Sequence, residues 1–381
     1  MDNPDKPLIY LIVGARPNFM KAAPLIRALE ERAPEIKSLL VHTGQHYDYE
    51  MSKAFFEDLD MPDPDIYLGV GSGTHAEQTA KIMISLEKEI FDNRPDLIVV
   101  FGDVNSTLAA SVVASKLMVP VAHVEAGLRS FDRTMPEEIN RIVTDILSDL
   151  LFTTERDAIE NLRREGIPDE KIHFTGNVMI DTLLTFADKA RKSDITERLG
   201  LSDRNYAVLT LHRPSNVDVP EVFDGILEAL AEVSKNIPVV FPVHPRTKKR
   251  LAEFGFLDKF SSAFKTPPAE RGILLIDPVK YTEFLALEMK SLFVLTDSGG
   301  IQEETTFLGV PCLTLRNNTE RPVTLEVGTN ILVGTDPHRI IEESAKILRG
   351  EGKKGAIPEL WDGKASHRIA KIIKTKMEEQ K

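Results

Sequence analysis

The chain has 381 residues, of which 42% are hydrophobic, and its formal net charge is -12 at pH 7. This length is enough for two packed domains, and the acidic balance argues against nucleic acid or an anionic membrane surface as a partner. The single cysteine, Cys312, excludes an intrachain disulfide and a cysteine-rich zinc site, and its apolar neighbours indicate a small core residue.

Short apolar segments alternate with longer amphipathic segments along the chain. The expected strands are residues 8–13, 38–43, 97–101, 119–124, 150–153, 171–175, 206–211, 239–243, 273–276, 292–296 and 312–315. The expected helices between them include residues 22–32, 77–92, 107–116 and 222–234. Strands that alternate with helices of this length predict parallel sheets with helices on both faces.

A charged segment without a strand pattern, residues 187–204, separates two such groups of elements. We therefore predict an α/β protein with two doubly wound, Rossmann-like domains, residues 1–178 and 179–364, that face a central cleft. Residues 365–381 have the pattern of a helix, which is expected to pack back on the first domain. The polar start and the absence of an apolar segment long enough to span a bilayer predict a cytoplasmic protein with no membrane partner.

The segment from Asp297 to Glu304 has the pattern of an anion site. It follows an apolar strand and begins a predicted helix with Ser298, Gly299 and Gly300. Glycines let the backbone approach a ligand closely, and the first N–H groups of a helix are unpaired and lie at the positive end of its dipole. A phosphate group is therefore favoured there, with Glu304 one turn further on to accept the hydroxyls of a ribose. The alternative is an ordinary strand-to-helix turn that Ser298 caps.

Polar side chains also follow several other predicted strands. Asp103 and Glu125 lie at strand ends of the first half, and His212 and His244 at strand ends of the second. Ligands of open parallel sheets bind beyond the carboxyl ends of the strands. A capping or structural hydrogen bond is the alternative for each residue alone. Their coincidence favours acid–base chemistry on a phosphorylated ligand.

Several common motifs are absent. The sequence contains no G-x-x-x-x-G-K-[ST], no H-E-x-x-H and no G-x-S-x-G. The first strand leads into Gly14-Ala15-Arg16 instead of G-x-G-x-x-G, which disfavours a nicotinamide dinucleotide. Asp63-Pro64-Asp65 resembles a metal-binding D-x-D motif, but its prolines favour a surface loop.

A set of short motifs resembles one enzyme family. The motifs, in chain order, are Gly14-Ala15-Arg16-Pro17, Gly44-Gln45-His46, Phe101-Gly102-Asp103, His123-Val124-Glu125-Ala126-Gly127-Leu128-Arg129, Pro136-Glu137-Glu138-Ile139-Asn140-Arg141, Thr175-Gly176-Asn177, Asp297-Ser298-Gly299-Gly300-Ile301-Gln302-Glu303-Glu304 and Thr319-Glu320-Arg321-Pro322. Together they resemble the non-hydrolysing UDP-N-acetylglucosamine 2-epimerases over most of the chain, from about Leu8 to about Gly334.

The resemblance implies a fold like that of the B-type glycosyltransferases, a homodimer, a UDP-sugar substrate, no metal and no redox cofactor. Carried over by position, it implies essential residues at Asp103, Glu125, Glu137 and His212, with Lys21 close to the reacting groups. The binding residues that it implies are Arg16, Lys21, His212, Phe284 near the uracil, Ser298, Gly299 and Gly300 at the diphosphate, Glu304 at the ribose, and Arg321.

The implied reaction inverts C2 of the sugar, where the C–H bond is not acidic because no carbonyl is adjacent. We expect the C1–O bond to UDP to break as the C2 proton leaves, which gives a 2-acetamidoglucal and UDP. Re-addition of UDP, with a proton delivered to the other face, gives the epimer. This route needs donors for the departing diphosphate and an acid and a base on the sugar. Which carboxylate is the base stays open, because grouped carboxylates titrate together.

Four alternatives stay open at this point. The first is a hydrolysing relative that releases N-acetylmannosamine and UDP. The second is an epimerase of a related UDP-diacetamido-uronic acid. The third is a B-type glycosyltransferase with the same UDP pocket, and the fourth is a nucleotide-sugar binding protein without catalysis.

Overall fold

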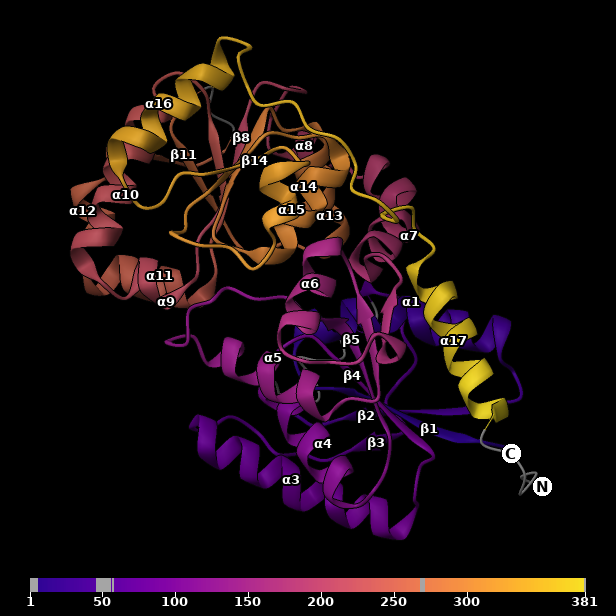
Figure 1. Cartoon of the computed structure of the whole chain (residues 1–381). Coiled ribbons are helices and arrows are strands. Elements are labelled where there is room, and N and C mark those ends of the chain that lie inside the picture. Colours follow the sequence, from indigo (N-terminus) through magenta and orange to yellow (C-terminus); the bar gives the residue numbers. More distant parts are fainter. Residues whose placement is uncertain (1–5, 46–55, 57, 268–270, 380–381) are drawn as a thin grey trace. The chain divides into compact units, whose positions relative to one another are not determined.

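The computed structural model describes residues 6–45, 56, 58–267 and 271–379. The chain forms two compact units. The first unit comprises the described residues up to Thr182 together with those from Glu359 onward, and the second unit is Leu183–Pro358. A parallel β-sheet forms the centre of each unit (Figure 1).

The sheet of the first unit has the strand order β3-β2-β1-β4-β5-β6-β7, and all neighbouring strands are parallel. Its strands are β1 (Leu8–Val13), β2 (Lys37–His42), β3 (Ile66–Tyr67), β4 (Leu97–Phe101), β5 (Val121–Ala126), β6 (Leu150–Thr153) and β7 (Ile172–Phe174). The winding direction reverses between β1 and β4. The sheet is therefore doubly wound, and its switch point lies at the carboxyl ends of these two strands.

Helices cover both faces of this sheet. They are α1 (Arg16–Arg32), α3 (His75–Asp92), α4 (Asn105–Lys116), α5 (Pro136–Leu147), α6 (Arg156–Arg164), the beginning of α7 (Val178–Arg191), a 3-10 turn at Asp169–Lys171, and α17 (Ala365–Glu379). Helices α3, α4 and α5 pack side by side on one face, and α1 and α17 pack together on the other (Figure 1). Leu86 and Ile90 of α3 and Val113 of α4 are buried against Tyr10 and Val100 of the strands.

The C-terminal helix α17 is fixed at its start and along one face. Ile369 and Ile373 are fully buried where α17 packs on α1. The Asp181 carboxylate accepts hydrogen bonds from the backbone N–H groups of Ala365 (3.2 Å) and Ser366 (2.7 Å). These two bonds pair donors that would otherwise be unsatisfied at the first turn of the helix.

The second unit repeats the same plan. Its sheet has the order β10-β11-β9-β8-β12-β13-β14, again with parallel neighbours. Its strands are β8 (Ala207–Thr210), β9 (Val239–Pro242), β10 (Phe264–Lys265), β11 (Ile273–Ile276), β12 (Phe293–Thr296), β13 (Cys312–Thr314) and β14 (Asn330–Leu332). The switch point of this sheet lies between β8 and β12.

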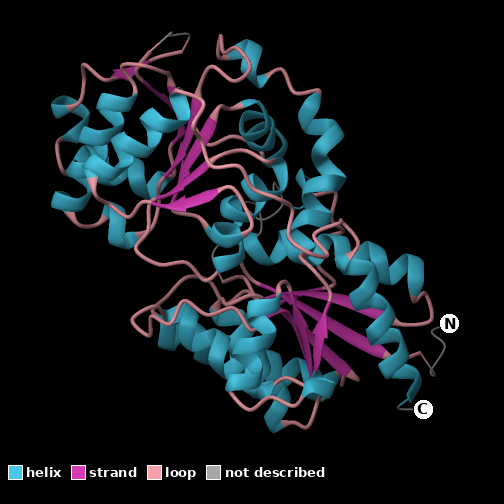
Figure 2. Cartoon of the chain, turned by 45° about the horizontal axis from the view of Figure 1, so that its top comes forward, coloured by secondary structure: helices cyan, strands magenta, loops and turns pink. Residues whose placement is uncertain are grey.

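Helices also cover both faces of the second sheet, as Figure 2 shows. They are the rest of α7, α8 (Ile195–Arg198), α9 (Pro214–Val217), α10 (Pro220–Val233), α11 (Pro245–Glu253), α12 (Phe256–Lys259), α13 (Tyr281–Lys290), α14 (Gly299–Leu308), α15 (Pro322–Glu326) and α16 (Pro337–Leu348). Phe223 and Ile226 of α10 and Ile340 of α16 are buried in the core with Phe241 and Leu295 of the strands.

The predicted fold class, two doubly wound parallel sheets, is confirmed. Every expected strand is present, with ends within two residues of those expected. The strand expected at residues 119–124 begins instead at Val121, because Pro120 has no N–H group and the Val119 N–H bonds back to the carbonyl of Ala114. The sequence missed β3, β10 and β14, which have only two or three residues each.

Within the described residues, no helix is both long enough and apolar enough to cross a membrane. Cys312 is fully buried in β13, and burial raises the pKa of its thiol to about 12. The interpretation of this cysteine as a core residue is confirmed.

Candidate active site

Three predicted site residues of the first unit follow strands that are neighbours in the sheet. Lys21 lies on α1, directly after β1, Asp103 follows β4, and Glu125 is the last but one residue of β5. Because β1, β4 and β5 are adjacent and parallel, these residues belong to one edge of the sheet, at its switch point. This is where open α/β sheets bind their ligands.

Lys21 and Glu125 form a buried ion pair. The Lys21 Nζ lies 2.6 Å from the Glu125 Oε1, and the two residues are only 4% and 3% exposed. Gly102 makes room for the amine, since a Cβ at this position would lie 2.6 Å from the Lys21 Nζ. Either group alone would be costly to bury as an ion, so removal of one partner should destabilise the protein. The pair places a cation beside a carboxylate that has little water around it.

The backbone of Glu125 is in an unusual conformation for a glutamate. Its φ angle is 77°, in the left-handed region, and the pairing of β5 with β6 shifts register between Val124 and Ala126. An irregularity of this kind redirects a side chain and is frequent next to active sites. A strained non-glycine residue costs on the order of 1–3 kcal/mol and persists only where its surroundings fix it. The strain therefore points to a functional role for Glu125.

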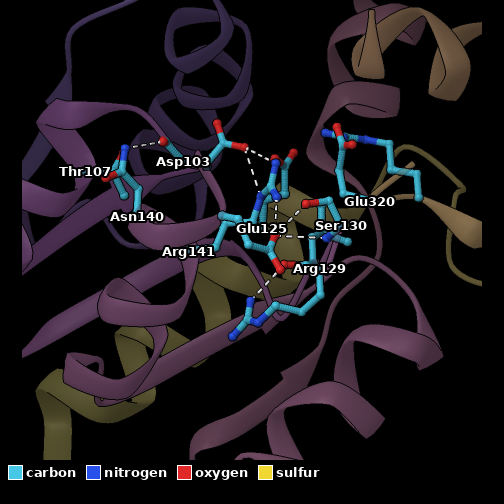
Figure 3. A network of polar contacts seen from close by, with 12 residues as sticks. Asp103, Thr107, Glu125, Arg129, Ser130, Asn140, Arg141 and Glu320 are labelled. Atoms are coloured by element: carbon cyan, nitrogen blue, oxygen red, sulfur yellow. Dashed lines mark hydrogen bonds and ion pairs between the residues drawn. The ribbon is translucent and has the colours of Figure 1, made fainter. Parts of the chain in front are cut away.

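Asp103 is held by two residues of α5. Its Oδ2 accepts hydrogen bonds from the Nε (3.0 Å) and Nη2 (2.7 Å) of Arg141, and its backbone carbonyl accepts one from the Asn140 side chain (2.8 Å) (Figure 3). Arg141 also donates to Glu138 through Nη1 (2.7 Å). The Asp103 side chain remains 24% exposed, so it is fixed in orientation and still open to a ligand.

Glu137 and Glu138 have different surroundings although they are adjacent on α5. Glu138 is buried and accepts hydrogen bonds from the backbone N–H groups of Ser130 (2.9 Å) and Phe131 (3.0 Å) as well as from Arg141. Glu137 is half-buried and makes no hydrogen bond or ion pair with another described residue. Glu138 thus holds the loop before α5, and Glu137 is the one of the two that has capacity for a ligand.

A buried, charged group lies beneath the Asp103 loop. The His123 Nδ1 is 2.6 Å from the Asp145 carboxylate, and its Nε2 is 2.8 Å from the carbonyl oxygen of Gly102. Both partners only accept, so each ring nitrogen of His123 faces an acceptor. Burial opposes the charge of Asp145, but His123 and then Arg129 outweigh it and hold the pKa of this carboxyl below its ordinary value. This cluster fixes the turn that presents Asp103.

In the second unit, Asp297 organises the residues after β8 and β12. It is fully buried, and its Oδ2 accepts hydrogen bonds from the backbone N–H groups of His212 (2.9 Å) and Arg213 (2.8 Å). Its Oδ1 lies 2.9 Å from the His212 Nδ1. Burial opposes its charge, but His212 and these hydrogen bonds hold the pKa of Asp297 below its ordinary value.

The contact with Asp297 sets the orientation of the predicted histidine. Because the His212 Nδ1 donates to a carboxylate, the other ring nitrogen, Nε2, points away from Asp297, and the side chain is 42% exposed. His212 is therefore placed to contact an anionic ligand.

The start of α14 lies against a group of charged side chains. Gly299 is the first residue of the helix, and a Cβ on it would lie 2.6 Å from the Arg321 Nη1 and 2.7 Å from the Glu320 Oε1. Arg321 is 5% exposed and pairs with Glu303 through Nε (2.6 Å) and with Glu320 through Nη1 (2.5 Å). The guanidinium is thus locked beside the amino end of the helix, where an anion is favoured.

The side chain of Ser298 does not cap this helix. Ser298 occupies the N-cap position, but its hydroxyl makes no capping hydrogen bond, so the alternative interpretation of a turn capped by Ser298 is wrong. Its backbone N–H donates to the Thr296 hydroxyl (3.0 Å). Gly299 is buried and Gly300 half-buried.

Glu304 lies on the second turn of α14 and is 3% exposed. Its Oε1 accepts a hydrogen bond from the Tyr281 hydroxyl (2.7 Å). Phe284, half-buried, is three residues after Tyr281 on α13. The carboxylate expected at the ribose is thus held by a helix that also carries the aromatic residue expected near the uracil.

The remaining predicted residues are placed as follows. Arg16 is the first residue of α1 and is half-buried. His244 is the N-cap of α11, where its Nδ1 accepts a hydrogen bond from the backbone of Arg246 (3.2 Å). His244 therefore makes a structural hydrogen bond, which is the alternative to a catalytic role for this residue. His46, which belongs to one of the motifs, lies outside the described residues.

Sequence reasoning missed three residues that organise these sites. Arg141 follows Glu138 by three helical residues, and this spacing alone predicts a pair on one helix face. Asp145 holds His123 from 22 positions away, and Tyr281 holds Glu304 from 23 positions away. Neither separation carries a local sequence signal.

The chain was compared with known proteins. Residues 27–374 match the family model described as UDP-N-acetylglucosamine 2-epimerase. A UDP-N-acetylglucosamine 2-epimerase of Methanocaldococcus jannaschii is 46% identical over 370 residues, which cover 96% of this chain and 98% of the relative. A UDP-2,3-diacetamido-2,3-dideoxy-D-glucuronate 2-epimerase of Pseudomonas aeruginosa is 42% identical over 369 residues, which cover 96% of this chain and 99% of the relative.

A solved structure agrees with the sequence comparison. The crystal structure of the M. jannaschii UDP-GlcNAc 2-epimerase in complex with UDP-GlcNAc and UDP matches this chain with a TM-score of 0.87 and 45% sequence identity. The match covers 97% of this chain and 99% of that chain.

Proposed function

The chain belongs to the UDP-N-acetylglucosamine 2-epimerase family, and from this premise we propose that it interconverts UDP-N-acetylglucosamine and UDP-N-acetylmannosamine. The observation that carries the proposal is the buried Lys21–Glu125 pair at a strained strand end. A carboxylate in such a place suits proton transfer at a carbon whose hydrogen is not acidic.

The first half of the proposed reaction is an elimination. The C1–O bond to the β-phosphate breaks and its electron pair leaves with UDP. A base removes the C2 proton, and the C1=C2 double bond of a 2-acetamidoglucal forms. In the second half, UDP re-adds to C1 and a proton reaches C2 from the opposite face. Atoms and electrons balance without water, a metal or a redox partner.

The departing diphosphate needs donors. We assign this role to the start of α14, with the backbone N–H groups that follow Ser298, and to His212 and Arg16. His212 is suited because its contact with Asp297 fixes the orientation of its ring. Loss of a single donor of this kind typically costs about 10²–10³-fold in turnover.

The proton transfers need an acid and a base on the sugar. We assign them to the set formed by Glu125, Asp103 and Glu137, with Lys21 paired to Glu125. Asp103 is held by Arg141, which favours its anionic form, and Glu137 has free capacity for a ligand. General acid–base catalysis of this type typically raises the reaction rate by about 10²–10⁴-fold.

We propose further that the enzyme is non-hydrolysing. Lys21 and Glu125 are almost fully buried, which supports exclusion of water from the reacting carbon. The test is incubation with UDP-N-acetylglucosamine and analysis of the sugar products. Retained UDP-N-acetylmannosamine supports the proposal, and free N-acetylmannosamine with stoichiometric UDP would establish hydrolysis instead.

One of the comparisons supports a different UDP-sugar as an alternative substrate. The P. aeruginosa relative is named for UDP-2,3-diacetamido-2,3-dideoxy-D-glucuronate and is 42% identical to this chain over nearly its full length. Parallel assays with both UDP-sugars would decide between them. The substrate with the higher kcat/KM is the one for which the site is built.

We also propose a homodimer. Exposed apolar side chains recur at a spacing of seven residues on two helices of the first unit, Ile84 and Phe91 on α3 and Ile139 and Ile146 on α5. A mainly apolar groove of about 540 Å³ lies between α3, α4 and α5. Such a surface suits a second copy of the same chain.

Light scattering would test the homodimer. The chain has a mass of 42.6 kDa, so a dimer gives twice this value, and Phe91→Asp should shift the mass toward that of one chain. A wild-type mass of a single chain at micromolar concentration would overturn the proposal.

A further inference from the structure

One buried carboxylate contacts the chain on both sides of Glu125. Asp145 lies near the end of α5 and is fully buried. Its Oδ1 is 2.6 Å from the Nδ1 of His123, which comes two residues before Glu125. Its Oδ2 accepts the backbone N–H of Gly127 (3.1 Å), which comes two residues after Glu125. Asp145 therefore spans residues 123–127, with Glu125 at their centre.

These two contacts lie on either side of the irregularity in β5. The pairing of β5 with β6 shifts register between Val124 and Ala126, and Glu125 between them has a φ angle of 77°. A strained residue of this kind persists only where its surroundings fix it. Because the register shifts at this point, regular pairing with β6 does not define the conformation. The contacts of Asp145 before and after the irregularity supply that support.

The same carboxylate is linked to the turn that carries Asp103. The Nε2 of His123 is 2.8 Å from the carbonyl oxygen of Gly102. Gly102 directly precedes Asp103, and a Cβ on it would lie 3.5 Å from the Glu125 Oε1. The Asp145–His123 contact therefore connects the two turns that carry Asp103 and Glu125, the proposed acid–base residues of neighbouring strands.

Asp145 also has a cation beside it, which suggests a simpler role. The Arg129 Nη1 lies 2.7 Å from the Asp145 Oδ2, and the Arg129 Nε and Nη2 donate to Glu165 (2.8 and 2.6 Å). A buried ion pair of this kind could serve stability alone. The two roles make different demands. An ion pair needs the charge of Asp145, whereas a bridge between His123 and Gly127 needs hydrogen-bonding groups at both ends.

We propose that Asp145 is a positioning residue that holds Glu125 in its left-handed conformation and, through His123, fixes the turn before Asp103. Asp145 is fully buried, so it acts through these residues and not on the sugar. The inference rests on the proposed function, because it gives Asp145 the task of aligning the proposed acid–base residues.

The test measures kcat and UDP affinity in two variants of the full chain that lose the same charge. Asp145→Asn keeps an oxygen for the Gly127 N–H and directs its NH₂ group to the His123 Nδ1, so its kcat should stay within about fivefold of the wild type. Asp145→Ala has neither group and should lower kcat by about 10²-fold, because a misplacement of about 1 Å can have this effect. The proposed UDP site at the start of α14 belongs to the second unit, so titration calorimetry should give an unchanged Kd for UDP in both variants.

Two controls separate positioning from a loss of stability. Asp149→Asn changes an aspartate whose Oδ2 accepts the Val121 N–H (3.1 Å) at the opposite end of β5, and it should keep the wild-type kcat. Ile90→Ala removes volume from the core of the first unit but no hydrogen bond. At a temperature at which every variant is folded, Ile90→Ala should also keep the wild-type kcat, whereas Asp145→Ala should not.

His123→Asn tests the link to Gly102 separately and decides the question if Asp145→Ala does not fold. The shorter side chain can place an amide nitrogen near the position of the His123 Nδ1, but it cannot reach the Gly102 carbonyl oxygen. We expect kcat to fall by about tenfold or more, with an unchanged Kd for UDP. A wild-type kcat in folded His123→Asn would contradict the proposed link.

Three further results would overturn the inference while the proposed function stands. The first is a wild-type kcat in Asp145→Ala, and the second is an equal loss of kcat in Asp145→Ala and Asp145→Asn. The third is a crystal structure of Asp145→Ala in which Glu125 keeps its left-handed φ angle and its contact with Lys21. Failure of the wild type to epimerise either UDP-sugar would be a different result, since it would overturn the proposed function and this inference with it.

Discussion

Asp297→Asn tests the support of the diphosphate site most directly. Asp297 is buried, accepts the backbone N–H groups of His212 and Arg213, and contacts the His212 Nδ1. Asparagine keeps the shape but has one acceptor oxygen and no charge. If its oxygen serves the two backbone groups, its NH₂ group faces the His212 Nδ1, which must then accept, and the ring loses the acceptor that orients it.

The magnitude follows from the contacts that change. Two backbone hydrogen bonds and one side-chain contact lose the strengthening that a charged acceptor provides, about 1 kcal/mol each. We expect the free energy of unfolding to fall by about 2–3 kcal/mol. Loss of the correctly oriented His212 at the diphosphate should lower kcat by about 10²-fold.

The effect on stability has a defined pH dependence. Burial opposes the charge of Asp297, but the charge of His212 and hydrogen bonds from His212 and Arg213 hold its pKa below the ordinary value of 3.8. For a depressed pKa, the stabilisation is complete above the unfolded value and is lost as pH falls through the folded value. Denaturant unfolding should therefore show a difference between wild type and Asp297→Asn that shrinks below about pH 3.8.

Asp277→Asn is the matched control. Asp277 also follows a strand, β11, but its side chain is 85% exposed and pairs with an exposed lysine. We expect a change in unfolding free energy within about 0.5 kcal/mol. If Asp297→Asn changes stability and kcat no more than Asp277→Asn does, the reasoning about His212 is refuted.

Three further predictions concern single residues of the two units. Lys21→Met removes the ion-pair partner of the buried Glu125, so we expect the free energy of unfolding to fall by about 3–5 kcal/mol. The double variant Lys21→Met/Glu125→Gln should recover part of this loss. An unchanged melting temperature of Lys21→Met would contradict the prediction. Gly299→Ala places a Cβ 2.6 Å from the Arg321 guanidinium. Titration calorimetry should therefore show that this variant binds UDP at least about tenfold more weakly. An unaltered affinity would mean that UDP does not approach this backbone. Cys312→Ser should retain the kcat of the wild type. The wild-type thiol should resist alkylation at pH 8, because burial raises its pKa to about 12. Rapid alkylation of the folded enzyme would show that the thiol is accessible.

The fold was largely predictable because the central strands of both sheets are buried on both faces. Such strands appear in the sequence as continuous apolar segments, as in residues 97–101 and 273–276, where the expected and observed ends coincide. The short strands β3, β10 and β14 carry too few residues for such a signal. The exact end of β5 was also not predictable, since it depends on the irregularity at Glu125, which comes from pairing with β6.

The site was predictable only where its residues lie in motifs at strand ends. Asp103, Glu125 and His212 follow this rule, and their catalytic roles stay predictions. The sequence does not indicate that Glu138 is the structural and Glu137 the open carboxylate, because burial on α5 depends on the fold of the preceding loop. The predicted cytoplasmic location and homodimer likewise stay predictions.

The most direct test of the proposed chemistry is incubation of the enzyme with UDP-N-acetylglucosamine in D₂O, followed by proton NMR. Elimination and re-addition at C2 predict a mixture of the two epimers that carries deuterium at C2, with no cofactor added. Epimerisation without deuterium at C2 would contradict the proposed route.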